Sequence, residues 1–237
     1  MVQCYIPAGT FQMGSDSGDS DEQPVHSVAL DAFWMDQTEV TNAQYALCVE
    51  AGACYPPDHT GSYSRSSYFY DAAYANYPVI YINDWSQAVA YCTWAGRELP
   101  TEAQWEYAAR GGLAGALYPW GYESPVCTLG AENGAQFSSC MPYDTILIGS
   151  FSPNGFGLFD MAGNVWEWVA DWYDDTYYSI SPAENPTGPA SGDYHVLRGS
   201  SWYYHRYFLR VSDRYDGGPA ASVYGIGSIG FRCAHSP

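Results

Sequence analysis

Residues 196–234, VLRGSSWYYHRYFLRVSDRYDGGPAASVYGIGSIGFRCA, are the most informative part of this chain. Two blocks, LRGSSW at residues 197–202 and IGFRC at residues 229–233, bracket a segment rich in Tyr, Arg, Ser, Asp and Gly. Rigid amphipathic aromatics mixed with adaptable polar side chains are typical of contact surfaces, and a hydrophobic core has a different composition. The pattern therefore predicts a display segment held between two fixed anchors.

Composition narrows the range of functions. The chain has 237 residues, 26 acidic and 8 basic side chains and a formal charge of −18, and every basic residue is Arg. Such a surface repels phosphate backbones, so no nucleic-acid partner is expected. The hydrophobic fraction of 47% excludes disorder. No apolar run approaches the roughly 20 residues that span a bilayer, and Met1 is not followed by a signal-peptide pattern, so membrane insertion is not expected.

The seven cysteines favour an oxidising compartment, and therefore an extracellular or cell-surface location. Cys48 could pair with Cys54 around a short loop, and Cys127 with Cys140 across a turn-rich stretch. Cys92 and Cys233 would tie a helix in the middle of the chain to the C-terminus, leaving Cys4 unpaired. The chain has no CxxC or Cys/His spacing of the zinc-binding type, so disulfides are favoured over a metal site.

Local patterns predict strands over residues 6–13 and 25–35. Helices are predicted over residues 41–51, capped by Thr38 or Thr41, then from Asp84 to Gly96, and from Thr101, which forms a capping-box pattern with Gln104. From residue 113 onward, Gly, Pro, Asn and Ser recur every few residues, which predicts short strands and ordered loops with little helix. Without internal repeats or linker-like tracts, one domain over residues 1–237 is expected.

Several blocks carry a family resemblance when they are taken together. They are IPAGTFQMGS (6–15), DQTEVTNAQYALCV (36–49), YCTWAGRELPTEAQWEYAARGG (91–112), YPWG (118–121), NGFGLFDMAGNVWEWVADWY (154–173), LRGSSW and GFRC. In this order they resemble the formylglycine-generating enzyme (sulfatase-modifying factor) family across nearly the whole chain. The resemblance implies an α+β, C-type-lectin-like fold with two or three helices around short antiparallel strands and much irregular structure.

The resemblance fails at the reactive atoms. Formylglycine-generating enzymes use two cysteines just after the anchor that matches LRGSSW, because a thiolate must bind copper(I) or attack. Residues 202–214 contain no Cys; Tyr204 stands near the first position, and Phe208 or Leu209 near the second. The five histidines lack HxxxH and HxE spacing, and His205 has no evident nucleophile to activate. We therefore expect no catalytic residues, no copper and no enzyme activity.

The block GLFDMAGNVWEW at residues 157–168 resembles a calcium loop of the same family. Carried over residue by residue, the ligands would be Asp160, Gly163, Val165 and Glu167, and crowded oxygen ligands suit calcium. The alternative is that Asp160 caps a turn and Glu167 pairs internally. The resemblance also matches Cys92 and Cys233 to family cysteines, whereas a second family pair would fall near Ala108 and Ser212 and is missing.

Within residues 197–233, positions that match the family scaffold alternate with positions that do not. This texture resembles the variable proteins of diversity-generating retroelements, in which randomised AAC-type codons cannot encode Lys, Glu, Gln, Met or Trp. Residues 203–228 contain none of those five types. The candidate ligand-binding residues are Tyr203, Tyr204, His205, Arg206, Tyr207, Phe208, Asp213, Tyr215, Asp216, Ser222, Tyr224 and Ser228.

The sequence thus predicts a non-catalytic protein that binds an unknown protein or surface ligand and is displayed on a cell surface or phage particle. Replacing Tyr204, Arg206 and Tyr215 with Ala is expected to leave the melting temperature nearly unchanged. Two alternatives stay open. The segment could be an ordinary solvated family loop, or the chain could be an enzyme or enzyme accessory that lacks the usual cysteine pair.

Overall fold

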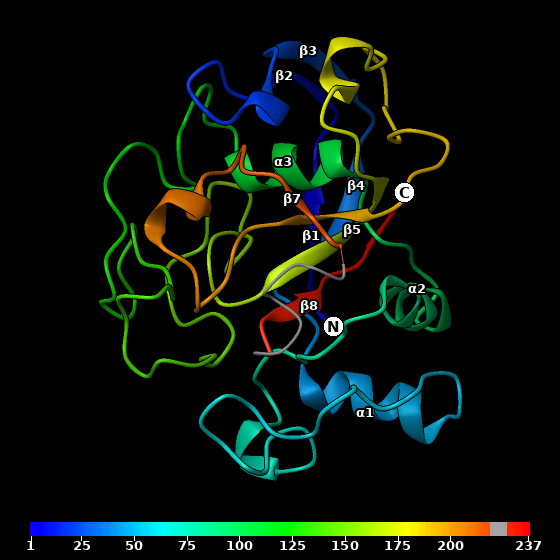
Figure 1. Ribbon diagram of the computed structural model, residues 1–237, viewed down its shortest axis with the longest axis vertical. Helices are drawn as coiled ribbons and strands as arrows, with labels where there is room; N and C mark the ends of the chain where they lie inside the picture. The colour runs from blue at the N-terminus through cyan, green and yellow to red at the C-terminus, as the bar shows by residue number, and fades with distance from the viewer. Residues whose placement is uncertain (219–226) are drawn as a thin grey trace.

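Three α-helices form where the sequence supplies capping residues (Figure 1). The computed structural model describes residues 1–218 and 227–237, and its helices are α1 (Asn42–Glu50), α2 (Trp85–Trp94) and α3 (Glu102–Arg110). The capping residues Thr41, Asp84 and Thr101 each accept a backbone N–H, and a Gln three residues later bonds back to each cap. Gly111 ends α3 with φ of 56°, a left-handed conformation that favours glycine. All three predicted helices are confirmed.

The strands form three small sheets. β1 (Gln3–Ile6), β4 (Phe33–Asp36) and β9 (Ala234–His235) form one sheet, and β2 (Gly9–Met13) pairs with β3 (His26–Leu30) in a second. The third sheet has the order β7-β6-β5-β8, with β5 (Trp166–Trp172), β6 (His195–Arg198), β7 (Tyr215–Asp216) and β8 (Ile229–Phe231). All pairs are antiparallel except β5 with β8. Short 3₁₀ helices lie at Ser20–Glu22, Ala72–Tyr74, Tyr177–Ser179 and Arg206–Leu209.

The two long strands predicted near the N-terminus are each divided in two. β1 and β2 belong to different sheets, and Pro7, which has no backbone N–H to donate, stands between them. β3 and β4 are separated at Asp31, whose N–H donates to Asn185 Oδ1 at 2.9 Å. Sheet membership is a long-range property, so alternation along one segment could not reveal these breaks.

Aromatic side chains and disulfides hold the elements together. Trp105, Trp166, Trp168 and Trp202 are among the largest fully buried side chains. The disulfides Cys48–Cys54, Cys92–Cys233 and Cys127–Cys140 are confirmed, and Cys4 is free as expected. None of the described helices has the length and apolar character needed to cross a bilayer.

Arginines form most of their ion pairs inside the protein. Arg198 contacts Glu106 at 2.6 Å, Arg214 contacts Glu102 at 2.7 Å and Arg232 contacts Glu167 at 2.6 Å. Arg65, Arg97, Arg110 and Arg210 also pair with carboxylates. Of the eight arginines, Arg206 alone has no ion pair with a described residue. The cationic charge of the chain therefore lies mostly inside, and its surface is strongly acidic.

Candidate binding surface

The first anchor of the display segment is built on the end of β6. Gly199 and Ser200 have φ of 88° and 66°, so the chain turns sharply there. A side chain at Gly199 would press on the Trp105 ring at 3.0 Å, which explains the glycine. Trp202 is fully buried, and its Nε1 donates to the carbonyl of Gly227 at 3.2 Å. This bond links the start of the display segment to the part that leads into β8.

Beyond Trp202 the chain presents a row of aromatic rings. Tyr203 and Tyr204 have ring centroids 5.7 Å apart, Tyr204 and Phe208 5.4 Å, and Phe208 and Tyr207 5.6 Å. Tyr203 is 36% and Tyr207 44% exposed. Such rings offer a large contact area with few rotatable bonds, so little entropy is lost when they bind a partner.

Tyr204 from this row and the nearby Tyr215 have a structural role as well. Tyr204 and Tyr215 are half-buried and lie 5.6 and 5.2 Å from the ring of Trp166 on β5. The expectation that Ala at these two positions leaves the melting temperature nearly unchanged is therefore revised, because both rings pack on a fully buried tryptophan. Arg206 is exposed and has no ion pair with any residue in the described ranges, so the same expectation remains a prediction for that residue.

The row extends to two tyrosines from distant loops. Tyr143 lies 5.8 Å from Tyr203, and Tyr63 lies 5.7 Å from Tyr143. Both also contact Trp202, at 5.1 and 5.3 Å. Sequence reasoning missed both residues. The abundance of Tyr and Ser in residues 56–76 was a signal for Tyr63, whereas Tyr143 lies outside that stretch. We call Tyr63, Tyr143, Tyr203, Tyr204, Tyr207, Phe208 and Tyr215 the aromatic surface.

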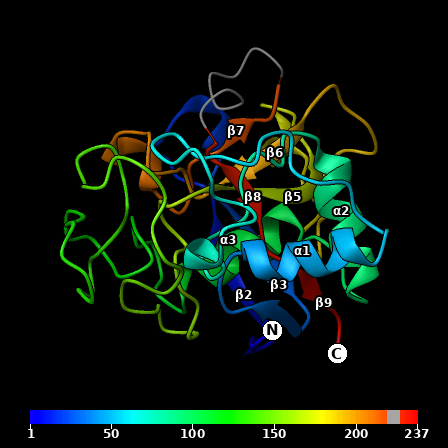
Figure 2. The same ribbon diagram turned by 90° about the horizontal axis from the view of Figure 1, so that it is seen from below.

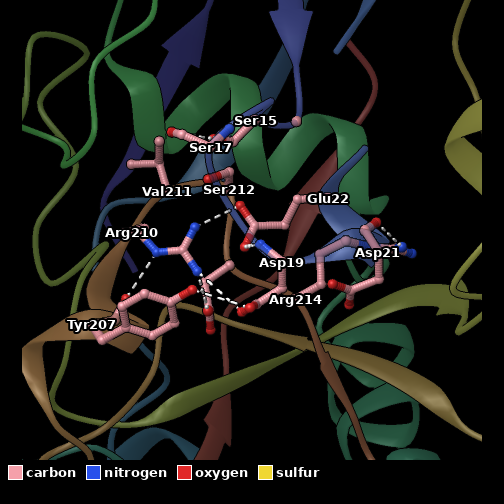
Figure 3. A network of polar contacts seen from close by, with 12 residues as sticks. Ser15, Ser17, Asp19, Asp21, Glu22, Tyr207, Arg210, Val211, Ser212 and Arg214 are labelled. Atoms are coloured by element: carbon pink, nitrogen blue, oxygen red, sulfur yellow. Dashed lines mark hydrogen bonds and ion pairs between the residues drawn. The ribbon is translucent and has the colours of Figure 1, made fainter. Parts of the chain in front are cut away.

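Arg210 fixes the far side of the row (Figure 3). Its guanidinium lies 4.3 Å from the centre of the Tyr207 ring, and its Nε donates to the Tyr207 carbonyl at 3.0 Å. It also binds Glu22 at 2.7 Å and Asp213 at 3.1 Å. The Tyr207 hydroxyl donates to Asp19 at 3.0 Å. The loop at residues 203–209 is therefore supported from both sides, by Trp202 and by Arg210.

Asp213 and Ser228 belong to this support, so the expectation that they are exposed is wrong. Asp213 is 2% exposed and faces Arg210. Burial raises the pKa of Asp213 well above its ordinary value, and the negative charge of Glu22 adds to the rise while Arg210 opposes it. Ser228 is fully buried, and its carbonyl accepts the N–H of Trp166 at 2.7 Å.

The remaining predicted ligand-binding residues differ in their exposure to solvent. Tyr203, His205, Arg206, Tyr207 and Asp216 are exposed, and Tyr204, Phe208 and Tyr215 are half-buried. Ser222 and Tyr224 lie outside the described residues.

Comparison with known proteins identifies the family. The family described as the sulfatase-modifying factor enzyme 1-like domain matches residues 2–237. The chain belongs to this family. It is 36% identical over 282 residues to the formylglycine-generating enzyme of Streptomyces coelicolor, an alignment that covers 98% of this chain and 88% of the enzyme. It is 31% identical over 298 residues to the inactive C-alpha-formylglycine-generating enzyme 2 of Bos taurus, covering 99% and 87%.

A solved structure supports the same assignment. Treponema denticola variable protein 1 superposes with a TM-score of 0.77 at 26% identity, covering 99% of this chain and 95% of that chain. The α+β, C-type-lectin-like fold expected for the family is thus confirmed, as is the likeness to a variable protein.

Because the chain belongs to this family, the state of its cysteines shows whether it has a pair of free thiols. All seven cysteines are described, and six form disulfides. The remaining thiol, Cys4, is half-buried and donates to the Gly157 carbonyl at 3.4 Å. Burial raises the pKa of Cys4, so the thiolate is disfavoured. This family member therefore has no second free thiol with which Cys4 could form a reactive pair.

The calcium loop of the family coincides with a cluster of buried carboxylates. Asp160 accepts the N–H of Gly149 at 2.6 Å, and Glu167 accepts two bonds from Arg232, at 2.6 and 2.7 Å. Glu39 is fully buried, and its Oε2 has no hydrogen-bond partner among the described residues. Burial raises the pKa of Glu39 and of Asp160, and nearby negative charge adds to both shifts.

The side chains of this cluster offer oxygen atoms, the ligand type that a hard cation takes. Three carboxylates, from Glu39, Asp160 and Glu167, share one guanidinium, that of Arg232, so the cluster lacks countercharge when all three are ionised. Glu39, which sequence reasoning did not nominate, supplies an oxygen that has no partner among the described residues. The contacts of Asp160 and Glu167 are also those of the alternative expectation, a capped turn and an internal ion pair. A cation at this site would rely most on Asp160 and Glu39, because Glu167 is already bound to Arg232.

Proposed function

We propose that this protein is a non-catalytic binding protein whose aromatic surface contacts a protein or surface ligand, in the manner of a retroelement variable protein. One observation carries the proposal: exposed Tyr203, His205, Arg206 and Tyr207 stand on a backbone held by buried Trp202 and Arg210. Exposed side chains on such a support can change without loss of the fold. The binding specificity can then vary while the scaffold stays constant.

Three further observations support this function. The structure is similar to that of Treponema denticola variable protein 1. The chain lacks the paired thiols that formylglycine-generating enzymes use, and one relative in the same family carries the name of an inactive enzyme. The three disulfides support an extracellular, cell-surface or phage-particle location.

The competing function is enzymatic, and a direct assay separates the two. The purified protein would be incubated with a CxPxR peptide, copper and oxygen, with the Streptomyces coelicolor relative as the positive control. We expect the relative to convert the peptide cysteine to an aldehyde and this protein to leave it unchanged. Aldehyde formation by this protein would overturn the binding function and favour the enzyme.

Natural variation tests the display function itself. The gene would be sequenced from many isolates together with its flanking DNA. We expect changes concentrated at the exposed positions 203, 205, 206, 207 and 216, with residues 197–202 and 229–233 unchanged. A reverse transcriptase gene and a near-copy of the segment should lie nearby. An even spread of changes over the whole chain would contradict the proposal.

We also propose that the carboxylate cluster binds calcium. Asp160, Glu39 and the carbonyl oxygens of Gly163 and Val165 would hold the ion, which would neutralise buried negative charge. Calcium should raise the melting temperature of protein freed of metal with EDTA, and Glu39→Gln should reduce that increase. Equal melting temperatures with and without calcium would show that Arg232 alone balances the cluster.

A further inference from the structure

Figure 2 shows α2 beside the sheet that contains β5, β6 and β7. A pocket of about 490 Å³ lies beside the aromatic surface and is lined by residues from the start of α2 and from that sheet. Its walls include Asp84, Trp85, Asp193, Tyr194 and His195. None of the residues that line it is an arginine. The pocket lies outside both the aromatic surface and the carboxylate cluster.

Hydrogen-bond acceptors face this pocket. His195 is 8% exposed, and its Nδ1 lies 3.2 Å from the carbonyls of Ala170 and Asp171, so this nitrogen carries the proton. Its Nε2 is then a lone-pair acceptor, and it has no hydrogen-bond partner among the described residues. Burial lowers the pKa of His195, which keeps the ring neutral near pH 7. Asp193 is exposed and forms no ion pair with any residue in the described ranges.

Aromatic rings make the walls rigid. His195 is sandwiched between Trp85 and Trp172, with both centroid distances at 3.7 Å. Trp85 is held in place because its Nε1 donates to the Val169 carbonyl at 2.8 Å. Tyr194 is 38% exposed. Aromatic faces combined with carboxylates are the surroundings that cationic groups prefer in proteins.

The pocket continues the aromatic surface along β5. Trp166 and Trp168 are two residues apart on that strand, so they face the same side of the sheet. Trp166 lies under Tyr204 and Tyr215, and Trp168 lines the pocket. Gly217, two residues after Tyr215, also lines the pocket, and a side chain there would overlap the Trp168 ring. A ligand that contacts the aromatic surface can therefore also reach into the pocket.

We propose that this pocket binds a guanidinium or primary ammonium group. The inference deepens the proposed function, since the group would be a basic side chain of the partner contacted by the aromatic surface. His195 Nε2 and the carboxylates of Asp84 and Asp193 accept from the cation, and the Tyr194 ring, which lines the same pocket, offers an aromatic contact. The net charge of −18, with seven of the eight arginines in ion pairs, draws cations toward this face.

The test uses defined probes on the whole protein. Binding of N-acetyl-arginine amide would be measured by NMR titration of the tryptophan indole signals, with N-acetyl-citrulline amide as the uncharged control. We expect saturable shifts of Trp85 with the arginine probe and at least about fivefold weaker binding of citrulline. The absence of saturable shifts, or equal binding of both probes, would overturn the proposal.

Matched variants locate the site. Asp84→Asn/Asp193→Asn removes two charges, and Asn keeps the oxygen that caps α2. We expect this pair to weaken arginine binding about fivefold or more, since each exposed charge contributes modestly. The control Glu123→Gln/Glu132→Gln changes the net charge equally through exposed residues outside the pocket, and it should leave affinity within about twofold. Equal weakening by both pairs would indicate nonspecific attraction and would refute the site.

Two further experiments complete the test. The first distinguishes a protein side chain from a free small cation, and the second tests the pocket independently of the aromatic surface. A tetra-arginine peptide that binds at least about tenfold more tightly than the amide indicates a protein side chain, whereas equal affinities indicate a free small cation and refute the assignment to a protein partner. Tyr203→Ala/Tyr207→Ala should leave binding of the amide unchanged. The pocket can thus be refuted without the aromatic surface, and the aldehyde assay can refute the display function without the pocket.

Discussion

Substitutions in the display segment should separate supporting rings from exposed ones. Tyr204→Ala removes ring contacts with Trp166, Phe208 and Tyr203, at 5.6, 5.4 and 5.7 Å. An aromatic pair contributes about 0.5–1.5 kcal/mol beyond burial, so we expect a loss of about 3 kcal/mol in the free energy of unfolding. For a chain of this length that loss lowers the melting temperature by about 6–12 °C.

The matched controls are Arg206→Ala and Asp216→Ala. Both side chains are exposed and neither forms an ion pair with a described residue, so each change should stay within about 0.5 kcal/mol. Thermal melts followed by circular dichroism and urea midpoints of the three variants would provide the comparison. Equal shifts for Tyr204→Ala and Arg206→Ala would refute the division of the segment into support and surface.

Three other predictions concern the scaffold. Removing the Cys92–Cys233 disulfide, which spans 141 residues, should cost about 5 kcal/mol, and removing Cys48–Cys54, which spans 6, about 2 kcal/mol; chemical denaturation of the two double-Ala variants would show whether this order holds. Burial and the charge of Glu102 raise the pKa of Asp171 to about 8, so the wild-type protein should lose stability as pH rises from 4 to 8, because the unfolded chain releases this proton near pH 4 whereas the folded protein holds it up to about pH 8. Asp171→Asn should therefore gain stability over the wild type at pH 8 and match it near pH 4, and melting temperatures that differ equally at both pH values would contradict this. Thr101→Ala removes the cap of α3 and should cost about 1 kcal/mol, whereas Thr101→Ser should be nearly neutral in the same melts.

The sequence was informative wherever the cause of structure is local. The three helices were predictable because each cap lies within four residues of its partner. The anchors on either side of the display segment were equally visible, since Trp202 and Phe231 are apolar and fully buried.

Contacts between residues that are far apart in the sequence could not be predicted. Asp213 could not be assigned to the support without Glu22, which reaches Arg210 from the other end of the chain. Tyr63 and Tyr143 join the aromatic surface through the packing of separate loops around Trp202. The sequences of these loops have no periodic pattern from which their contact with Trp202 could be predicted.

The isolation of Arg206 has a practical consequence. Trypsin cuts after Arg and Lys, the chain has no Lys, and seven arginines are engaged in ion pairs. Native protein should therefore be nicked first after Arg206, in the middle of the display loop. The Cys92–Cys233 disulfide joins the two fragments across the cut, so they should migrate as one species until a reductant separates them.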